Sequence, residues 1–164
     1  MSRLHWIEIP TKGRLAIMAR PRADDWLVAE VDGWKSDGVD LVVSLLESEE
    51  VAELGLQSEA KFCREKGIEF LSFPIPDRGV PETGDARRLA GSLAREITEG
   101  RSVAIHCRAG IGRSAVIAAC AMIWSGVAAR EALRRIQEAR GVSVPDTEAP
   151  RDWVMAFQET HKSL

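Results

Sequence analysis

"VAIHCRAGIGRS", residues 103–114, contains the change of pattern on which the fold of this chain depends. An apolar run typical of a buried strand ends at His106 and Cys107. A loop with two glycines follows, and residues 113–125 are then apolar on almost every side, which predicts a buried helix. Strand, loop and helix in this order indicate an α/β protein, in which ligands bind outside the carboxyl ends of the strands.

The rest of the chain alternates between strand-like and helix-like segments, and an eleven-residue loop rich in Pro and Gly, "PIPDRGVPETG", spans residues 74–84. The alternation predicts a mostly parallel sheet with helices on both faces. Strands are expected over residues 4–9, 13–19, 39–47, 68–75 and 102–107, the first two as an edge hairpin. Helices are expected over residues 23–36, 58–66, 84–99, 113–125, 129–140 and 147–161.

Length and composition restrict the possible classes of protein. A chain of 164 residues is expected to form one domain, residues 1–164, and its net charge of −3 offers no general attraction for nucleic acid. The longest apolar run is too short to span a bilayer, and the first residues lack the apolar core of a signal peptide. Three scattered cysteines predict neither a disulfide framework nor a zinc site. We therefore expect a cytoplasmic monomer with no membrane partner and no bound metal.

The loop after Cys107 has the features of an anion-binding site. A turn between a strand and a helix directs backbone N–H groups at its centre, and the helix N-terminus adds a partial positive charge. Glycines allow the close approach of backbone to ligand, and the planar guanidinium of Arg113 suits two phosphate oxygens. The predicted substrate-binding residues are Arg108, Ala109, Gly110, Ile111, Gly112 and Arg113.

The same loop should ionise Cys107. Aligned N–H groups, a helix N-terminus and a guanidinium all stabilise a thiolate, which is the nucleophilic form. The Ser114 hydroxyl can donate to the sulfur and make it a better leaving group. Cys63 and Cys120 lack such neighbours and are expected to be buried, unreactive side chains.

Residues His106 to Ser114 match the pattern H-C-x5-R-S, which resembles the signature of cysteine-dependent protein tyrosine phosphatases, and the short chain resembles the small dual-specificity type. The resemblance implies a central sheet of four or five strands flanked by about six helices. It also implies hydrolysis of phosphoproteins through a phospho-cysteine intermediate, with no metal or organic cofactor.

Such chemistry needs a general acid across the pocket, because an alkoxide is a poor leaving group. Asp77 is the predicted acid: it follows a strand directly, and its place upstream of the cysteine resembles the family's acid loop. Asp146 is an alternative that also looks like a helix cap. Glu82 and Asp85 are further alternatives, although both fall where a helix should begin and where acidic caps are common.

Three further residues have specific expectations. His106 should hold the loop through hydrogen bonds, and Glu47, which follows a neighbouring strand, is a candidate partner for Arg113. Pro150 stands about where larger relatives place the glutamine that positions the hydrolytic water.

Other functions share parts of this pattern. A rhodanese-type sulfurtransferase also uses a loop cysteine, but its loop is usually one residue shorter and it needs no upstream acid. A non-catalytic phosphate-binding module would need no cysteine. On the phosphatase fold itself, phosphoinositides and RNA 5′-phosphates are alternative substrates, although Ala109 and Ile111 stand where inositide-specific loops tend to carry basic residues.

Overall fold

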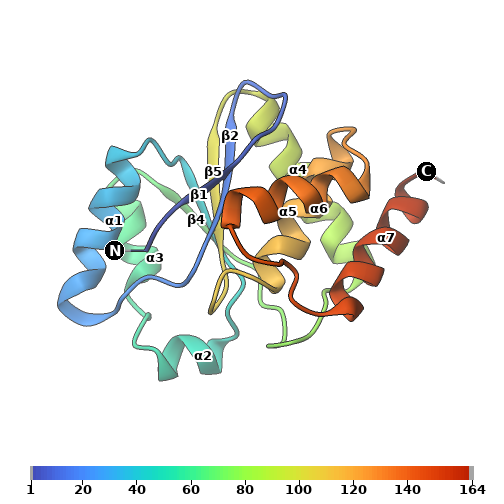
Figure 1. Cartoon of the computed structure of the whole chain (residues 1–164). Coiled ribbons are helices and arrows are strands. Elements are labelled where there is room, and N and C mark those ends of the chain that lie inside the picture. The colour runs from blue at the N-terminus through green and yellow to red at the C-terminus, as the bar shows by residue number, and fades with distance from the viewer. Residues whose placement is uncertain (1, 163–164) are drawn as a thin grey trace.

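The computed structural model describes residues 2–162 and contains a five-stranded sheet with the strand order β1-β2-β5-β3-β4 (Figure 1). Strand β1 pairs with β2 in the antiparallel sense, as expected for an edge hairpin, and every other pairing is parallel. The strands are β1 His5–Ile7, β2 Arg14–Met18, β3 Leu41–Ser44, β4 Glu69–Ser72 and β5 Ser102–His106.

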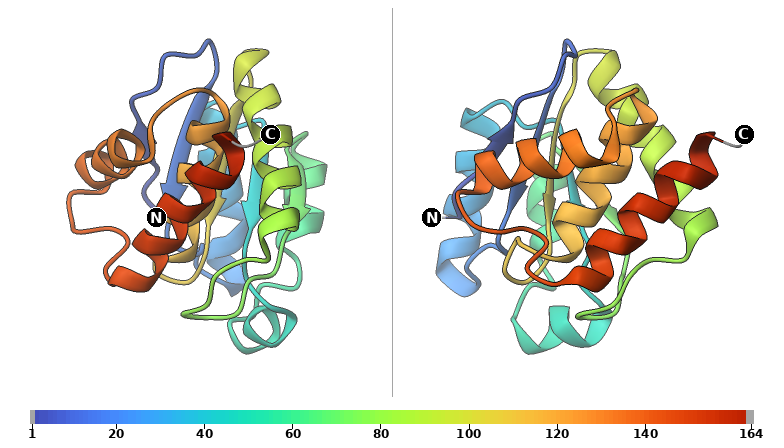
Figure 2. Two further views of the ribbon diagram at one scale, coloured as in Figure 1. Left: turned by 90° about the vertical axis from the view of Figure 1, so that its right-hand side faces the viewer. Right: turned by 45° about the vertical axis from the view of Figure 1, so that its right-hand side comes forward.

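Helices cover both faces of the sheet, with α1 and α3 on one side and α4 to α7 on the other, where α7 lies outside α5 (Figures 1 and 2). The short helix α2 lies below the sheet in Figure 1, beyond the carboxyl ends of the parallel strands. The helices are α1 Leu27–Ser36, α2 Ser48–Glu53, α3 Glu59–Glu65, α4 Thr83–Thr98, α5 Arg113–Trp124, α6 Ala129–Arg140 and α7 Glu148–Lys162, and a 3-10 turn spans Asp24–Trp26.

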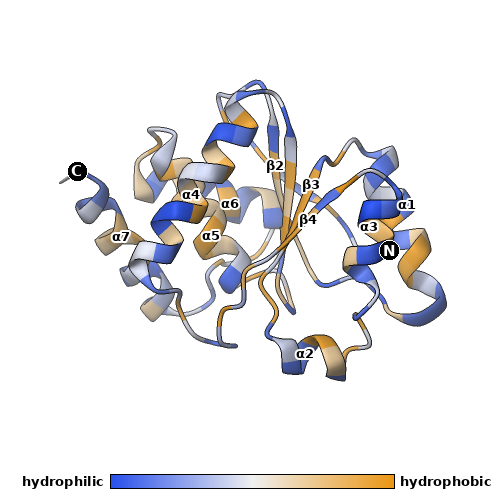
Figure 3. Ribbon diagram, turned by 180° about the vertical axis from the view of Figure 1, so that it is seen from behind, coloured by the Kyte–Doolittle hydropathy of each residue, from blue (hydrophilic) through white to orange (hydrophobic). Residues whose placement is uncertain are grey.

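Alternating side chains of the buried strands build a separate core on each face. Leu15 and Ile105 contribute to the core beneath α4 to α7, whereas Ala16 and Ala104 contribute to the core beneath α1 and α3. This follows from the period of two along a strand. Coloured by hydropathy, the strands and α5 stand out as apolar, while α4 and α7 carry polar outer faces (Figure 3).

Helix α5 is the most deeply buried helix in the described part of the chain, since all of its residues except Trp124 are buried. It is enclosed by the sheet and by α4, α6 and α7. Strand β5, which precedes it, lies in the middle of the sheet between β2 and β3. The loop that joins β5 to α5 is therefore held at both ends by the two most central elements of the fold.

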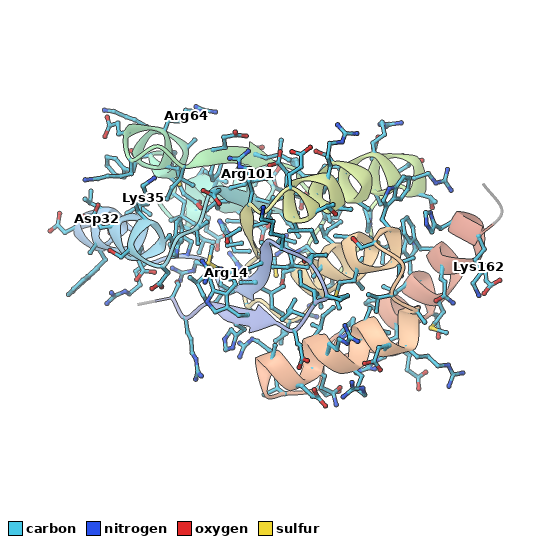
Figure 4. All side chains as sticks on the ribbon, turned by 90° about the horizontal axis from the view of Figure 1, so that it is seen from above. Arg14, Asp32, Lys35, Arg64, Arg101 and Lys162 are labelled. Carbon is cyan, nitrogen blue, oxygen red and sulfur yellow. The ribbon has the colours of Figure 1, made fainter. Side chains whose placement is uncertain are left out.

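At the amino-terminal ends of the parallel strands, the charged side chains have hydrogen-bond or ion-pair partners. Seen from above, Arg14 and Arg101 lie at the amino-terminal side of the parallel strands (Figure 4). Arg101 forms ion pairs with Glu69 at 3.0 Å and Glu96 at 2.8 Å, and Arg14 donates to the Ser102 hydroxyl at 3.1 Å. The charged groups at the amino-terminal ends of the strands are therefore engaged with one another, and the candidate site lies at the carboxyl ends.

The fold class predicted from the sequence is confirmed, with one addition. Residues 2–162 contain seven α-helices rather than about six, because the acidic residues after β3 form the separate short helix α2. No helix within these residues is both long and apolar enough to cross a membrane.

Candidate active site

Cys107 lies directly after β5, at the floor of a cavity of about 520 Å³. Its sulfur accepts a hydrogen bond from the Gly110 backbone N–H at 3.3 Å and is hydrogen-bonded to the Ser114 hydroxyl at 3.4 Å. Burial opposes ionisation of the thiol, but the Ser114 hydroxyl and N–H, the Gly110 N–H and the charge of Arg113 outweigh it and hold the pKa of Cys107 below its usual value. The side chain is therefore suited to act as a thiolate nucleophile.

The other two cysteines have the opposite environment. Burial raises the pKa of Cys63 to about 12, with a smaller contribution from the carboxylate of Glu59. Burial alone raises the pKa of Cys120. The contrast with Cys107 arises from the donors of the loop, since all three thiols are buried.

Gly110 shows why the loop needs glycine. Its φ is +74°, and a Cβ atom placed on it would lie 2.6 Å from the backbone carbon and oxygen of Met18 at the end of β2. Both the conformation and the space exclude larger residues. Close packing of the loop against β2 is thus part of the site's construction.

Arg113, the first residue of α5, has a side chain that is only 3% exposed. Its guanidinium makes a bidentate ion pair with Glu50, at 2.6 Å from Nη1 and 2.9 Å from Nη2. Nη1 also donates to the carbonyls of Ile75 at 3.0 Å and Leu45 at 3.4 Å. The contacts fix the guanidinium plane, as bidentate phosphate binding requires.

The prediction that Glu47 pairs with Arg113 was wrong, because Glu50 takes this place. Glu47 is the N-cap of α2, and its backbone N–H donates to Glu50 Oε1 at 3.1 Å. Glu47 and Glu50 have the spacing of a capping box. This sequence signal indicates a helix that begins after Glu47 and carries Glu50 in its first turn. An unpaired guanidinium would be costly at this depth, and the Glu50 carboxylate compensates the charge of Arg113.

Asp77 lies in the loop between β4 and α4 and lines the same cavity as Cys107. Its Oδ1 is 3.3 Å from Nη2 of Arg113, and its side chain is 51% exposed. The structure thus brings together the predicted nucleophile, arginine and acid, from segments far apart in the sequence. The cavity is lined by Asp77, Arg78, Gly79, Cys107, Arg108, Ala109, Ile111, Gly112, Arg113, Asp146, Thr147 and Pro150.

The three alternative acids differ in position. Glu82 is the N-cap of α4 and accepts from the N–H groups of Gly84 and Asp85, at 2.8 and 2.7 Å. Asp85 forms an ion pair with Arg88 on the surface of the same helix. Both therefore act as helix-capping or surface residues, whereas Asp146 lines the cavity beside Thr147 and Pro150.

Two further charged residues complete the surroundings of the loop. His106 is fully buried, and its Nε2 lies 2.6 Å from Glu59 Oε2 while its Nδ1 is 3.3 Å from the Cys107 carbonyl oxygen. Burial lowers the pKa of His106, but Glu59 outweighs this effect and raises it. Arg108 at the cavity wall forms an ion pair with Glu53 at 3.3 Å. Glu59 and Glu53 were not identified from the sequence, since each meets the loop only through the tertiary fold.

The arrangement can bind a tetrahedral oxyanion and attack it. The Gly110 N–H and the Arg113 guanidinium are donors of the kind that an oxyanion binds, and the Cys107 thiol has the lowered pKa of a nucleophile. Asp77 lines the same cavity with a carboxyl group, which is the kind of group that can give a proton to a leaving group. Within residues 2–162, no three His, Cys, Asp or Glu side chains are grouped so that they could hold a metal ion.

Fold and site together define a small dual-specificity phosphatase domain of the cysteine-dependent protein tyrosine phosphatase superfamily. More narrowly, the chain belongs to the family described as PTP-SAK, Swiss Army Knife protein, DSP-PTPase phosphatase domain, whose model matches residues 1–159. Cyclin-dependent kinase inhibitor 3 of Rattus norvegicus is 25% identical over 127 residues, which cover 76% of this chain and 60% of that protein. The chain thus spans less than two thirds of that relative's length.

Solved structures agree on the fold. Kinase associated phosphatase, crystallised with its catalytic cysteine replaced by serine, has a TM-score of 0.89 at 18% identity and covers 99% of this chain and 97% of its own. The active form of the phosphatase Tk-PTP has a TM-score of 0.74 at 28% identity, with 90% of this chain and 92% of its own covered.

Proposed function

We propose that residues 1–164 form one phosphatase domain that hydrolyses phosphomonoesters of phosphoproteins through a phospho-cysteine intermediate, without metal or organic cofactor. The observation that carries this proposal is the meeting of three groups in one cavity: a Cys107 thiol with a lowered pKa, the buried guanidinium of Arg113 and the carboxyl group of Asp77. A protein substrate is favoured by the names of the relatives, which refer to a kinase inhibitor and a kinase-associated phosphatase.

In the first half-reaction, the phosphate group lies against the loop's N–H groups and Arg113. A phosphate oxygen competes with Asp77 for the Arg113 guanidinium, because Nη2 is 3.3 Å from Oδ1 of Asp77. The Cys107 sulfur then attacks phosphorus, an S–P bond forms and the P–O bond to the substrate breaks. Protonated Asp77 gives its proton to the departing oxygen.

In the second half-reaction, water attacks the phosphorus of phospho-cysteine. Asp77, now a carboxylate, takes a proton from the water, and the S–P bond breaks to release inorganic phosphate. The Ser114 hydroxyl, 3.4 Å from the sulfur, donates to the thiolate as it leaves. Asp146, Thr147 and Pro150 line the cavity, so this wall is the part of the site that the attacking water would meet.

The test compares the wild type with Cys107→Ser and, as a control, Cys63→Ala. The wild type and Cys63→Ala should hydrolyse p-nitrophenyl phosphate and phosphopeptides, whereas Cys107→Ser should bind inorganic phosphate without turnover. Parallel assays with a phosphoinositide, a 5′-phosphorylated RNA and thiosulfate separate the alternative functions. Faster turnover of one of these than of phosphopeptides would contradict the proposed substrate, and an active serine variant would contradict the covalent route.

A further inference from the structure

Residues 108–112, which follow Cys107 and lead into α5, are called the phosphate loop below. The backbone carbonyls of its first three residues accept hydrogen bonds from residues outside the loop. The Arg108 carbonyl accepts from the Arg20 backbone N–H at 3.1 Å. The next two carbonyls, of Ala109 and Gly110, accept from the side chain of Arg140, through Nη2 at 3.3 Å and Nε at 3.2 Å. Three consecutive carbonyls therefore point away from the cavity and have a hydrogen-bond partner.

The direction of these carbonyls decides the direction of the loop's N–H groups. In a planar trans peptide, the C=O of one residue and the N–H of the next point in opposite directions. A carbonyl of Ala109 turned toward Arg140 directs the Gly110 N–H toward Cys107, and this N–H does donate to the sulfur at 3.3 Å. By the same reasoning, the Gly110 carbonyl bound to Arg140 turns the Ile111 N–H inward.

These two peptide groups flank the residue of the loop with the greatest conformational freedom. Gly110 has a φ of +74°, and glycine populates positive and negative φ about equally, so the loop sequence alone favours neither orientation strongly. An external donor is therefore needed to select the orientation in which the N–H groups face the anion. Arg140 supplies two donors in one rigid plane, which suits two adjacent carbonyls.

Arg140 reaches the loop because of where α6 ends. It is the last residue of that helix, which terminates at Gly141 in the left-handed conformation with φ +82°. Helix α6 packs against β1 and α5, and the backbone carbonyl of Ala139 lies 3.3 Å from Nδ1 of His5 on β1. The guanidinium is thus placed by packing that is independent of the cavity.

We infer that Arg140 is a positioning residue for catalysis, which holds the two peptide groups around Gly110 so that their N–H groups face the Cys107 sulfur and the bound phosphate. Arg140 touches neither group directly and acts through the Ala109 and Gly110 carbonyls. The cationic donors also polarise these peptides and strengthen the opposing N–H groups as donors. The inference deepens the proposed function and rests on it, since it assumes that the loop serves a thiolate and a phosphate.

The test uses Arg140→Gln and Arg140→Lys, with Arg130→Gln as a control on the exposed first turn of the same helix. Three quantities are measured: the pKa of Cys107 from the pH dependence of its alkylation by iodoacetamide, the affinity for inorganic phosphate from protection against alkylation, and the melting temperature. Arg140→Gln should raise the thiol pKa and weaken phosphate binding by roughly tenfold, which corresponds to the loss of about one charged hydrogen bond. Arg140→Lys has one ammonium in place of a planar pair of donors, so its thiol pKa and phosphate affinity should lie between those of the wild type and Arg140→Gln.

A positioning role is contradicted if Arg140→Gln has the thiol pKa and phosphate affinity of Arg130→Gln. A lower melting temperature with an unchanged thiol pKa would also contradict it, because the residue would then be only structural. If the glutamine variant does not fold, the lysine variant decides, and a wild-type thiol pKa in that variant overturns the inference. None of these measurements needs turnover, so a wild type that hydrolyses no phosphoester would refute the proposed function and leave this test intact.

Discussion

Replacing Glu50 by alanine should destabilise the protein far more than the same change at Glu53 on the same helix. Glu50 accepts two short hydrogen bonds from Arg113. The Glu50 side chain is 9% exposed and that of Arg113 is 3% exposed. Glu53 makes one contact of 3.3 Å with Arg108, and its side chain is 69% exposed. The two variants therefore compare a buried ion pair with a surface one while removing the same kind of side chain.

The expected magnitudes differ clearly. Removing one partner of a buried pair leaves an uncompensated charge and costs about 3–5 kcal/mol, whereas an exposed pair contributes about 0–1 kcal/mol. For a domain of this size, each kcal/mol lowers the melting temperature by roughly 2–4 °C. Glu50→Ala should then melt roughly 6–20 °C below the wild type, and Glu53→Ala at most about 4 °C below it.

Urea unfolding and turnover of p-nitrophenyl phosphate test this together. Glu50→Ala should lower the urea midpoint without changing the slope, and should reduce kcat/KM because the guanidinium of Arg113 loses its orientation. Glu50→Gln keeps a hydrogen-bond acceptor but not the charge, so its urea midpoint and kcat/KM should lie between those of the wild type and Glu50→Ala. Equal midpoints for Glu50→Ala and Glu53→Ala would refute the view that Glu50 neutralises and orients Arg113.

Three further predictions concern the reacting groups. Arg113→Lys should lose most phosphate affinity and kcat/KM, because an ammonium cannot replace a planar pair of donors; near-normal values would remove Arg113 from the anion site. Asp77→Asn should slow phosphoserine peptides by about 10²–10⁴-fold and p-nitrophenyl phosphate far less, and an equal loss on both would mean that Asp77 only shapes its loop. A thiol is ionised above its pKa, and the pKa of Cys107 is lowered while that of Cys63 is about 12 and that of Cys120 is raised. Iodoacetamide at pH 6 should therefore label Cys107 well before Cys63 and Cys120, and inorganic phosphate should protect Cys107. Uniform labelling of the three thiols would contradict a lowered pKa of Cys107.

Much of the fold was predictable because its signals are local. The apolar runs of β3 and β5 and the amphipathic pattern of α4 each act through near neighbours in the chain. Helix α2 was not predicted, since six residues carry too little periodicity to be recognised.

The sequence by itself determined the phosphate loop, because Cys107, Gly110 and Arg113 lie within one short segment between a strand and a helix. The strand end, the glycines and the helix start are neighbours in the chain, so the pattern of an anion site is visible locally. Asp77 could be placed at the carboxyl ends of the strands, since it follows the strand predicted over residues 68–75.

Only the tertiary structure decided which groups neutralise and orient that loop. Glu50 rather than Glu47 meets Arg113 because of the turn of α2 on which it lies, and Glu59 and Arg140 reach the loop from helices on opposite faces of the sheet. Sequence patterns record which side of an element is buried, but not which buried polar group lies opposite it. That choice depends on how the helices pack on the sheet, and the cost of leaving a buried charge or carbonyl unpaired then selects the partner.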